Sequence, residues 1–425
     1  MCLKGFWPLT RSFSVLAHLA AMCVLVAGCD VPIKFFETNI LYVARWEKSQ
    51  SVDLQPAVED AQTALKVLFG TPDQPNWPEF LGEKHEDEQL INPGRLQQAA
   101  GAVRSDEQDV HYGLYREHCV LCHGITGDGL GPTSRFLSPY ARDFRLGKFK
   151  FKSTPIGKKP TRADLRRTLH EGVDGTSMPS FRLLKEQEIE ALIDYVIYLS
   201  VRGEVERKLL TEAALELDYE AGDRLLNTSL QSTDEEFKTQ WEKIQAKVIE
   251  VATSWTEADQ SARHDISPPD DYPLFGRDNP GTPEQRQRLA ASVANGDKLF
   301  HGPIANCVSC HGPFAKGDGQ TKSYDAWTKD WTEGLDPLDR EQLRPMLKLG
   351  ALKPTYLLPR NLRSGVFRGG ARPSDIYLRI VNGIDGTPMP AAPLQPDNPL
   401  GLSETDIWDL VNYLLSLPYE GGESR

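Results

Sequence analysis

Two segments of the chain carry the same spacing of apolar residues. Counted from Ile189 and from Ile407, apolar side chains recur at offsets of 3, 4, 7 and 10 residues. This spacing places them on one face of an α-helix, because the helical period is 3.6 residues. Ser403 and Asp406 supply an N-cap pair for the second of these helices. The pattern therefore predicts two amphipathic helices, each burying one face, at corresponding places in two halves of the chain.

The sequence ahead of each helix is repeated as well. Residues 172–179 read GVDGTSMP and residues 383–390 read GIDGTPMP, each after a helical stretch that begins near an aspartate. Residues 142–145 (RDFR) correspond to residues 360–363 (RNLR). Self-similarity of this kind indicates two homologous domains. We predict the domains at residues 105–203 and 285–425, the second enlarged by an insertion around residues 324–354.

The rest of the chain divides by composition. Residues 204–284 are polar and acidic with a helical pattern, which predicts a solvated helical spacer, with a partner-binding face as the alternative. Residues 29–104 form a poorly defined N-terminal segment. Its aromatic and aliphatic stretch at residues 35–46 either rests on a membrane surface or packs on the body of the protein. The predicted fold is all-α, with two tandem domains joined by this spacer.

A short motif precedes each methionine-containing segment. Residues 119–123 (CVLCH) and residues 307–311 (CVSCH) both read CxxCH, the attachment pattern of a c-type haem. One helical turn brings both thiols to the two haem vinyl groups, and the adjacent imidazole reaches the iron as an axial ligand. A zinc site built from the four cysteines would leave both histidines without a role. We therefore predict two covalently bound haem c groups, attached through Cys119, Cys122, Cys307 and Cys310, with the iron ligands His123 and His311.

Two of the three methionines that follow residue 28 lie at matching places in the repeat. Met178 and Met389 each stand in Gly-Thr-x-Met-Pro, whereas Met346 lacks this frame and is interpreted as packing. A thioether ligand raises the potential of haem iron, and a sixth protein ligand excludes substrates. The glycine permits a close loop and the proline fixes the backbone after the ligand. We predict Met178 and Met389 as the second axial ligands; the alternative is that both are core residues.

The first 28 residues have the layout of a signal peptide. Lys4 and Arg11 come first, and the apolar run at residues 15–28 follows without any Lys, Arg, Asp or Glu. This run is too short for a confident membrane span. Residues 25–29 (LVAGC) resemble the lipobox of bacterial lipoproteins, in which the cysteine is lipidated and becomes the first residue. We predict cleavage after residue 28 and lipidation of Cys29. The alternative is an uncleaved anchor with a stray cysteine.

Composition narrows the functional classes. A chain of 425 residues allows two or three domains, and a hydrophobic fraction of 40% is ordinary for a soluble protein, which excludes a polytopic membrane protein. The formal net charge is −12, and −14 without the two basic leader residues, which argues against a nucleic-acid partner. Of seven cysteines, four belong to the CxxCH motifs, two lie in the leader and one is Cys29. No pair is left for a structural disulfide.

Each repeat resembles a class I cytochrome c. The shared features are an N-terminal helix, Cys-x-x-Cys-His, a methionine loop, and a C-terminal helix that crosses the first. The resemblance covers roughly half of the chain in two blocks. It implies an all-α fold, His123 and His311 as the proximal iron ligands, and Tyr195 and Tyr413 in the region where the helices cross.

The resemblance also implies a partner for the proximal histidine, and the two repeats differ there. In the first domain the carbonyl of Pro132 is expected to accept the ring N–H of His123. The second domain has no proline at this place. The first domain has His111 where the second has Gly296, so a tight helix crossing is expected only in the second.

Two haems with both iron faces occupied suit one-electron transfer. We therefore predict an electron carrier rather than an enzyme, which passes single electrons between periplasmic or membrane-bound respiratory partner proteins. Its predicted location is the periplasmic side of a bacterial membrane, inner or outer, held by the lipid on Cys29. One alternative is a dihaem peroxidase, which needs an open or displaceable iron position. The other is a fixed cytochrome subunit of a quinol-oxidising or terminal oxidase complex.

One stretch of sequence runs against the acidic balance of the chain. Residues 142–167 contain ten basic and two acidic residues. Because this stretch lies between CxxCH and the methionine loop, we predict a basic rim around the first haem that steers an acidic redox partner. A solvated basic surface is the alternative. Arg145 and Arg363, which match in the repeat, are candidates for pairing with haem propionates.

Overall fold

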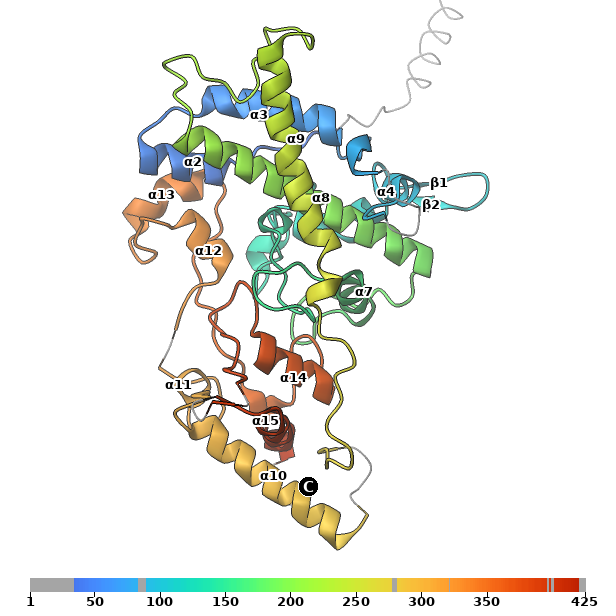
Figure 1. The fold of residues 1–425 in the computed structure, drawn as a ribbon, viewed down its shortest axis with the longest axis vertical. Coiled ribbons are helices and arrows are strands. Elements are labelled where there is room, and N and C mark those ends of the chain that lie inside the picture. Colours follow the sequence, from blue (N-terminus) through green and yellow to red (C-terminus); the bar gives the residue numbers. More distant parts are fainter. Residues whose placement is uncertain are drawn as a thin grey trace, which may run out of the picture.

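The computed structural model describes residues 34–82, 89–276, 281–320, 322–395, 397–398 and 401–419. The predicted leader and Cys29 lie outside the described residues. Helices dominate the fold (Figure 1), and the described part contains one small sheet, in which β1 (Arg104–Ser105) pairs antiparallel with β2 (His111–Tyr112). The predicted all-α fold class is confirmed. No helix of the described ranges has both the length and the hydrophobicity needed to cross a membrane.

The first domain is built around α8 (Glu186–Leu215), a helix of 30 residues. At its start the Glu188 carboxylate accepts the Lys185 N–H at 2.9 Å, and the apolar face predicted from Ile189 onward is buried. The helix does not end at residue 203, the predicted domain boundary. It continues for about three more turns, in which Val205 and Leu209 are fully buried.

Short helices surround the N-terminal half of α8. They are α5 (Leu114–His118), α6 (Val120–His123) and α7 (Arg162–Glu171), with 3₁₀ turns η3 (Ser134–Phe136) and η4 (Phe144–Leu146) between them. α5 meets α8 where the rings of Tyr115 and Tyr195 lie with centroids 4.7 Å apart. α5 is short because the chain before it forms β2 and then turns at Gly113, whose φ of 78° favours glycine. His111, the counterpart of Gly296, therefore lies in a strand and not in a crossing helix.

The N-terminal segment folds onto the first domain. α2 (Ile40–Gln50), α3 (Gln55–Phe69) and α4 (Pro93–Ala99) all contact α8, and the turn η1 (Glu79–Leu81) lies between the last two (Figure 1). Tyr42, Phe69 and Leu96 belong to the same buried core as α8. The Asn39 N–H donates to the buried carboxylate of Glu206 at 2.9 Å. Of the two interpretations of residues 35–46, packing on the body is the one that these contacts support.

The interpretation of residues 204–284 as a solvated spacer is wrong for its helices. α9 (Glu235–Thr256) packs against α8 and buries Ile244, Val248 and Trp255. These apolar residues lie on one face of a helix that also carries four acidic and three basic residues, and the acidic composition of the longer segment suggested a solvated helix. After the turn η5 (Asp259–Ser261) the chain runs in extended form to the second domain, yellow in Figure 1, and the Arg263 guanidinium donates to Asn382 at 3.1 Å.

The second domain is organised by a close helix crossing. α10 (Pro283–His301) crosses α15 (Glu404–Ser416), and a Cβ at Gly296 would overlap the carbonyl oxygen of Asp409. Phe300 and Tyr413 contact each other beside it, with ring centroids 5.4 Å apart. Ser403 caps α15 as predicted, accepting the Asp406 N–H at 3.1 Å. The domain also contains α11 (Val308–His311), α14 (Pro373–Asn382), η6 (Leu362–Ser364) and η7 (Leu417–Tyr419).

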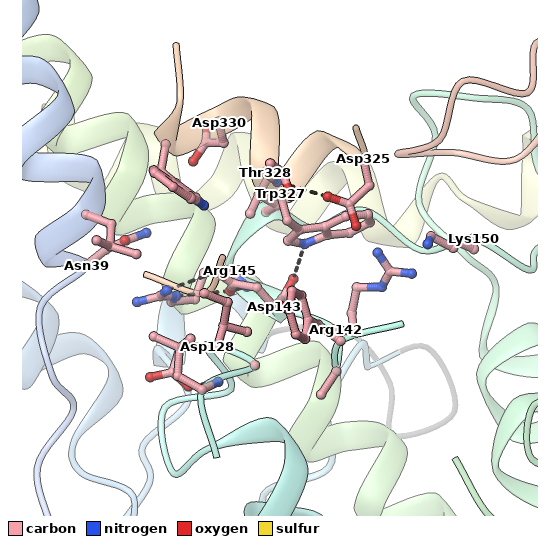
Figure 2. A pocket seen from close by; sticks show the side chains of 18 residues that line it. Asn39, Asp128, Arg142, Asp143, Arg145, Lys150, Asp325, Trp327, Thr328 and Asp330 are labelled. Carbon is pink, nitrogen blue, oxygen red and sulfur yellow. Dashed lines mark hydrogen bonds and ion pairs between the residues drawn. The ribbon is translucent and has the colours of Figure 1, made fainter. Parts of the chain in front are cut away.

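The insertion of the second domain reaches across to the first. It contains α12 (Ala326–Trp331) and α13 (Arg340–Lys348), which lie beside α2 (Figure 1). Asp330 accepts from Arg45 of α2 at 3.3 Å and from Arg207 of α8 at 2.7 Å. Trp327 stacks on the Arg142 guanidinium of the first domain, and both side chains line the same pocket (Figure 2). Met346 is buried in the apolar cluster of this insertion, in agreement with a packing role.

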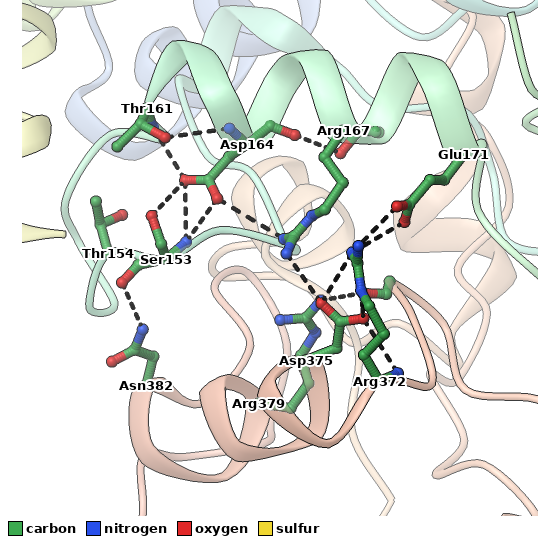
Figure 3. A network of polar contacts seen from close by, with 12 residues as sticks. Ser153, Thr154, Thr161, Asp164, Arg167, Glu171, Arg372, Asp375, Arg379 and Asn382 are labelled. Atoms are coloured by element: carbon green, nitrogen blue, oxygen red, sulfur yellow. Dashed lines mark hydrogen bonds and ion pairs between the residues drawn. The ribbon is translucent and has the colours of Figure 1, made fainter. Parts of the chain in front are cut away.

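A polar network joins α7 of the first domain to α14 of the second (Figure 3). Arg167 donates to the buried Asp375 at 2.9 Å, and Asn382 donates to the carbonyl of Ser153 at 2.9 Å. Nearby, Lys152 and Asp385 form an ion pair at 2.9 Å, with side chains only 3% and 5% exposed. Burying a charge is costly unless it is paired, so these contacts fix how the two domains dock.

Most of the basic stretch at residues 142–167 therefore does not form the predicted rim. Within the described chain, six of its ten basic side chains form ion pairs with carboxylates: Arg145, Lys152, Lys159, Arg162, Arg166 and Arg167. Two of these pairs cross to the second domain. Most charges of this stretch are neutralised by carboxylates of the same molecule. The predicted steering of an acidic partner by this stretch therefore loses its basis.

Candidate haem sites

The predicted residues of the first site surround one cavity. Cys119, Cys122, His123 and Met178 line one cavity together with apolar side chains of α7, α8 and the intervening loops, among them Phe149, Leu169, Ile193 and Val196. Two thiols, an imidazole and a thioether on apolar walls fit a large flat group that is covalently held and axially ligated.

Each CxxCH motif forms one helical turn. In α6 the His123 N–H donates to the Cys119 carbonyl at 2.9 Å, and in α11 the His311 N–H donates to the Cys307 carbonyl at 2.9 Å. The described cysteines form no disulfide. Burial raises the pKa of Cys119 to about 12 and that of Cys307 to about 11, so both are neutral thiols at pH 7.

The ring of His123 is held in one tautomer. Its Nδ1 donates to the Arg142 carbonyl at 3.0 Å, and because a carbonyl can only accept, the proton lies on Nδ1 and the Nε2 lone pair is free for a metal. The ring stacks on Phe144 with centroids 4.6 Å apart. Burial lowers the pKa of His123 to about 4, which keeps the imidazole neutral. The predicted acceptor, the Pro132 carbonyl, is wrong.

The second histidine is oriented in the same way. His311 Nδ1 lies 3.4 Å from the Arg360 carbonyl, and burial lowers the pKa of His311. Arg360 is the counterpart of Arg142 in the repeat, so both domains use one device and neither needs a proline. Sequence reasoning missed this acceptor, although the matching RDFR and RNLR segments carried the signal.

The methionine loops are identical in their hydrogen bonds. Met178 N–H donates to Thr176 Oγ1 at 3.1 Å and its carbonyl accepts the Val173 N–H at 3.1 Å. The same two bonds hold Met389, from Thr387 and Ile384, also at 3.1 Å. The threonine of Gly-Thr-x-Met-Pro thus fixes the methionine backbone, a role that the sequence prediction did not assign.

One of the two predicted propionate partners, Arg145, is not among the residues that line the first cavity. Arg145 is bound by its neighbour Asp143, with Nε–Oδ1 at 3.0 Å, and packs against Gly203 of α8. Arg363 Nε donates to the carbonyl of Phe314 at 2.6 Å, and its pairing with a propionate of the second haem stays a prediction.

Comparison with known proteins finds one cytochrome family model over each of the two sites. Residues 293–418 match the family model described as "Cytochrome c", and residues 107–196 match "Cytochrome C oxidase, cbb3-type, subunit III". Each match spans one CxxCH motif and one methionine loop. A solved chain of the Kuenenia stuttgartiensis reducing HAO-like protein complex is 24% identical, covers 72% of this chain and 94% of that one, and aligns with a TM-score of 0.41. No match was found among curated proteins. On the two family matches and the two CxxCH sites, the chain is a c-type cytochrome with two cytochrome c domains.

Proposed function

We propose that this cytochrome carries single electrons through two haem c groups, each ligated by histidine and methionine. One observation carries the proposal: both domains hold a neutral, oriented imidazole and a methionine loop fixed by the same pair of hydrogen bonds. Haem supplies the one-electron chemistry. The chain would supply covalent attachment and two axial ligands at each site and, in the first domain, an apolar cavity around the group.

A lipid on Cys29 would hold the protein at the periplasmic side of a bacterial membrane. Lys34, the first described residue, follows Cys29 by five residues, which span at most about 17 Å when extended. The segment that starts there packs on α8 of the first domain. The proposed anchor therefore keeps the first domain near the lipid surface, where donor or acceptor proteins embedded in the membrane are within reach.

The family match of the first domain favours a more specific version. Residues 107–196 match the model of subunit III of cbb3-type cytochrome c oxidase, which makes a fixed subunit of a terminal oxidase complex the second candidate. The chemistry is the same and the partner differs. Co-purification in mild detergent separates the two, because a fixed subunit comes with stoichiometric partners and a mobile carrier comes alone.

Carbon monoxide tests whether either iron has an open position. The reduced protein is expected to show no spectral change with carbon monoxide, and the half-reduced protein no peroxide turnover with an electron donor, because both axial positions are filled. Met178→Ala and Met389→Ala should each open one haem and bind carbon monoxide. Met346→Ala, which truncates a buried methionine of α13, is the matched control and should behave as wild type. Binding to the wild-type protein, or peroxide turnover, would favour the dihaem peroxidase instead.

A further inference from the structure

Three cationic side chains meet at one wall of the first haem cavity. Arg142 and Lys150 come from the first domain, and Arg368 comes from the second. The rest of the lining is mainly apolar. The cavity of the first domain is thus completed by a charged residue that the other domain supplies.

These cations have no carboxylate partner in contact. Within the part of the chain that the structure describes, none of the three forms an ion pair, and Arg368 Nε is buried without a hydrogen-bond partner. Arg368 donates from Nη2 to the Gly175 carbonyl at 3.3 Å. Burial lowers the pKa of Arg142 to about 10 and that of Lys150 to about 7, the second also through repulsion by Arg142, and Asp325 opposes both shifts. Burying three neighbouring positive charges beside an apolar cavity is costly unless an anion pairs with them, so this wall is suited to bind an anionic group.

We infer that Arg142, Lys150 and Arg368 bind the carboxylates of the first haem, so that the second domain completes the haem site of the first. The inference rests on the proposed haem binding. A haem has an apolar body and a carboxylate edge, which are the two chemistries that this wall and this cavity offer. Guanidinium groups pair with carboxylates through two parallel hydrogen bonds, which suits them to hold such an edge.

Trp327 of the inserted α12 positions one of these cations. The Arg142 guanidinium lies 3.5 Å from the centroid of the Trp327 ring, and Trp327 Nε1 donates to the Asp143 carbonyl at 3.1 Å (Figure 2). On its other side the indole packs against Gly386, where a Cβ would overlap it. Gly386 belongs to the methionine loop of the second domain. Trp327 therefore joins the carboxylate edge of the first haem to the loop that ligates the second.

The contact is approximately reciprocal. Arg360, the counterpart of Arg142, has its Nη2 3.0 Å from the position of a Cβ at Gly175, and Gly175 is the counterpart of Gly386. The arginine whose carbonyl orients each proximal histidine thus lies toward the methionine loop of the other domain. Arg360 contacts the methionine loop of the first domain directly at Gly175. Between Arg142 and the methionine loop of the second domain, Trp327 fills the space.

Removing one cation tests the inference through the reduction potential. A positive charge beside the propionates favours the reduced haem, so Arg368→Gln should lower the equilibrium constant for reduction of the first haem about tenfold, which is about 59 mV for one electron. Arg368→Lys keeps the positive charge, so the equilibrium constant for reduction of the first haem should stay close to that of the wild type. The matched control is Arg372→Gln, which removes an arginine of the same interface that pairs with Asp375 and Glu171 outside the cavity; it should shift neither haem.

Spectroelectrochemical titration with two resolved haems reads the result. Met178→Ala in each background identifies the first haem, because it changes that potential alone. Unchanged potentials in Arg368→Gln with both haems attached would overturn the inference, as would equal shifts in Arg368→Gln and Arg372→Gln, which would indicate a loosened interface only. Haem content by mass and by the pyridine haemochrome spectrum is scored separately. Absence of reversibly reduced haem in the wild type would instead refute the proposed function, and this inference with it.

Discussion

Asp385→Asn isolates the buried ion pair between the two domains. The change keeps the shape of the side chain and removes its charge, leaving the Lys152 ammonium 3% exposed with the carbonyls of Pro155 and Lys158 as its acceptors. Breaking a buried ion pair by removing one partner costs about 3–5 kcal/mol. Because two carbonyls remain, we expect the lower end, about 3 kcal/mol. That is a large part of the total stability of a domain, about 5–15 kcal/mol.

The assay is a double-mutant cycle with an exposed pair for comparison. Guanidinium unfolding of the haem-loaded protein, followed by circular dichroism, gives the free energy for wild type, Asp385→Asn, Lys152→Met and the double variant. The double variant should lose clearly less than the sum of the single changes. Lys208→Met breaks the pair with Glu250, which is similarly short at 2.8 Å but whose side chains are 40% and 63% exposed, and should cost no more than about 1 kcal/mol. Equal losses in Asp385→Asn and Lys208→Met would refute the docked interface.

The same pair gives a pH dependence with a definite sign. Burial alone would raise the pKa of Asp385, but the hydrogen bond and charge of Lys152 outweigh it and hold the pKa below its usual range. The stabilisation from Asp385 is therefore present above the unfolded pKa, about 3.9, and is lost as the pH falls through the folded value. The difference between wild type and Asp385→Asn should shrink below about pH 4. A difference that grows on acidification would contradict this assignment of charge.

Three further outcomes follow from the sites. Oxidised Met178→Ala and Met389→Ala should each weaken the far-red methionine-to-iron charge-transfer band, and the double variant should lose it; an unaffected band would move ligation to another side chain. Gly296→Ala should destabilise the second domain by roughly 1–3 kcal/mol in denaturant unfolding, since a Cβ there overlaps the Asp409 carbonyl, and a neutral result would disprove the tight crossing. Intact-mass measurement should find a lipidated Cys29 as the first residue and two covalent haems; a free thiol at Cys29 or a mass short of haem contradicts the corresponding half.

Much of the fold and of the candidate sites follows from local sequence. The apolar spacing from Ile189 and from Ile407 specifies a helix wherever it occurs, and the structure contains both helices. CxxCH and Gly-Thr-x-Met-Pro are short because one helical turn or one loop suffices to form them. The repeat then supplies a check that single motifs lack: the same hydrogen bonds hold Met178 and Met389.

What sequence could not supply are the partners from distant segments. The acceptor of His123 is a backbone carbonyl, and any residue has one, so the repeat marked the segments at residues 142–145 and 360–363 as matching without identifying the carbonyl that accepts. The run of basic residues looked like a surface because most of the carboxylates that pair with them lie outside this stretch of sequence, and two of them, Asp375 and Asp385, lie more than 200 positions away. α9 looked solvated because the segment that contains it is acidic as a whole, and the composition of the whole segment does not reveal an apolar stripe on one helix.

The insertion that carries Trp327 and Asp330 has a consequence for how such a chain can evolve. Two copies of one ancestral domain would at first have been separable, each folding and working alone. Here α12 and α13 of the later copy cover α2 and bind α8 of the earlier one, and Arg368 enters its cavity. Cutting the chain between the domains would strip both halves of contacts that neither can replace. The two domains no longer behave as independent units, and substitutions in either domain are constrained by its contacts with the other.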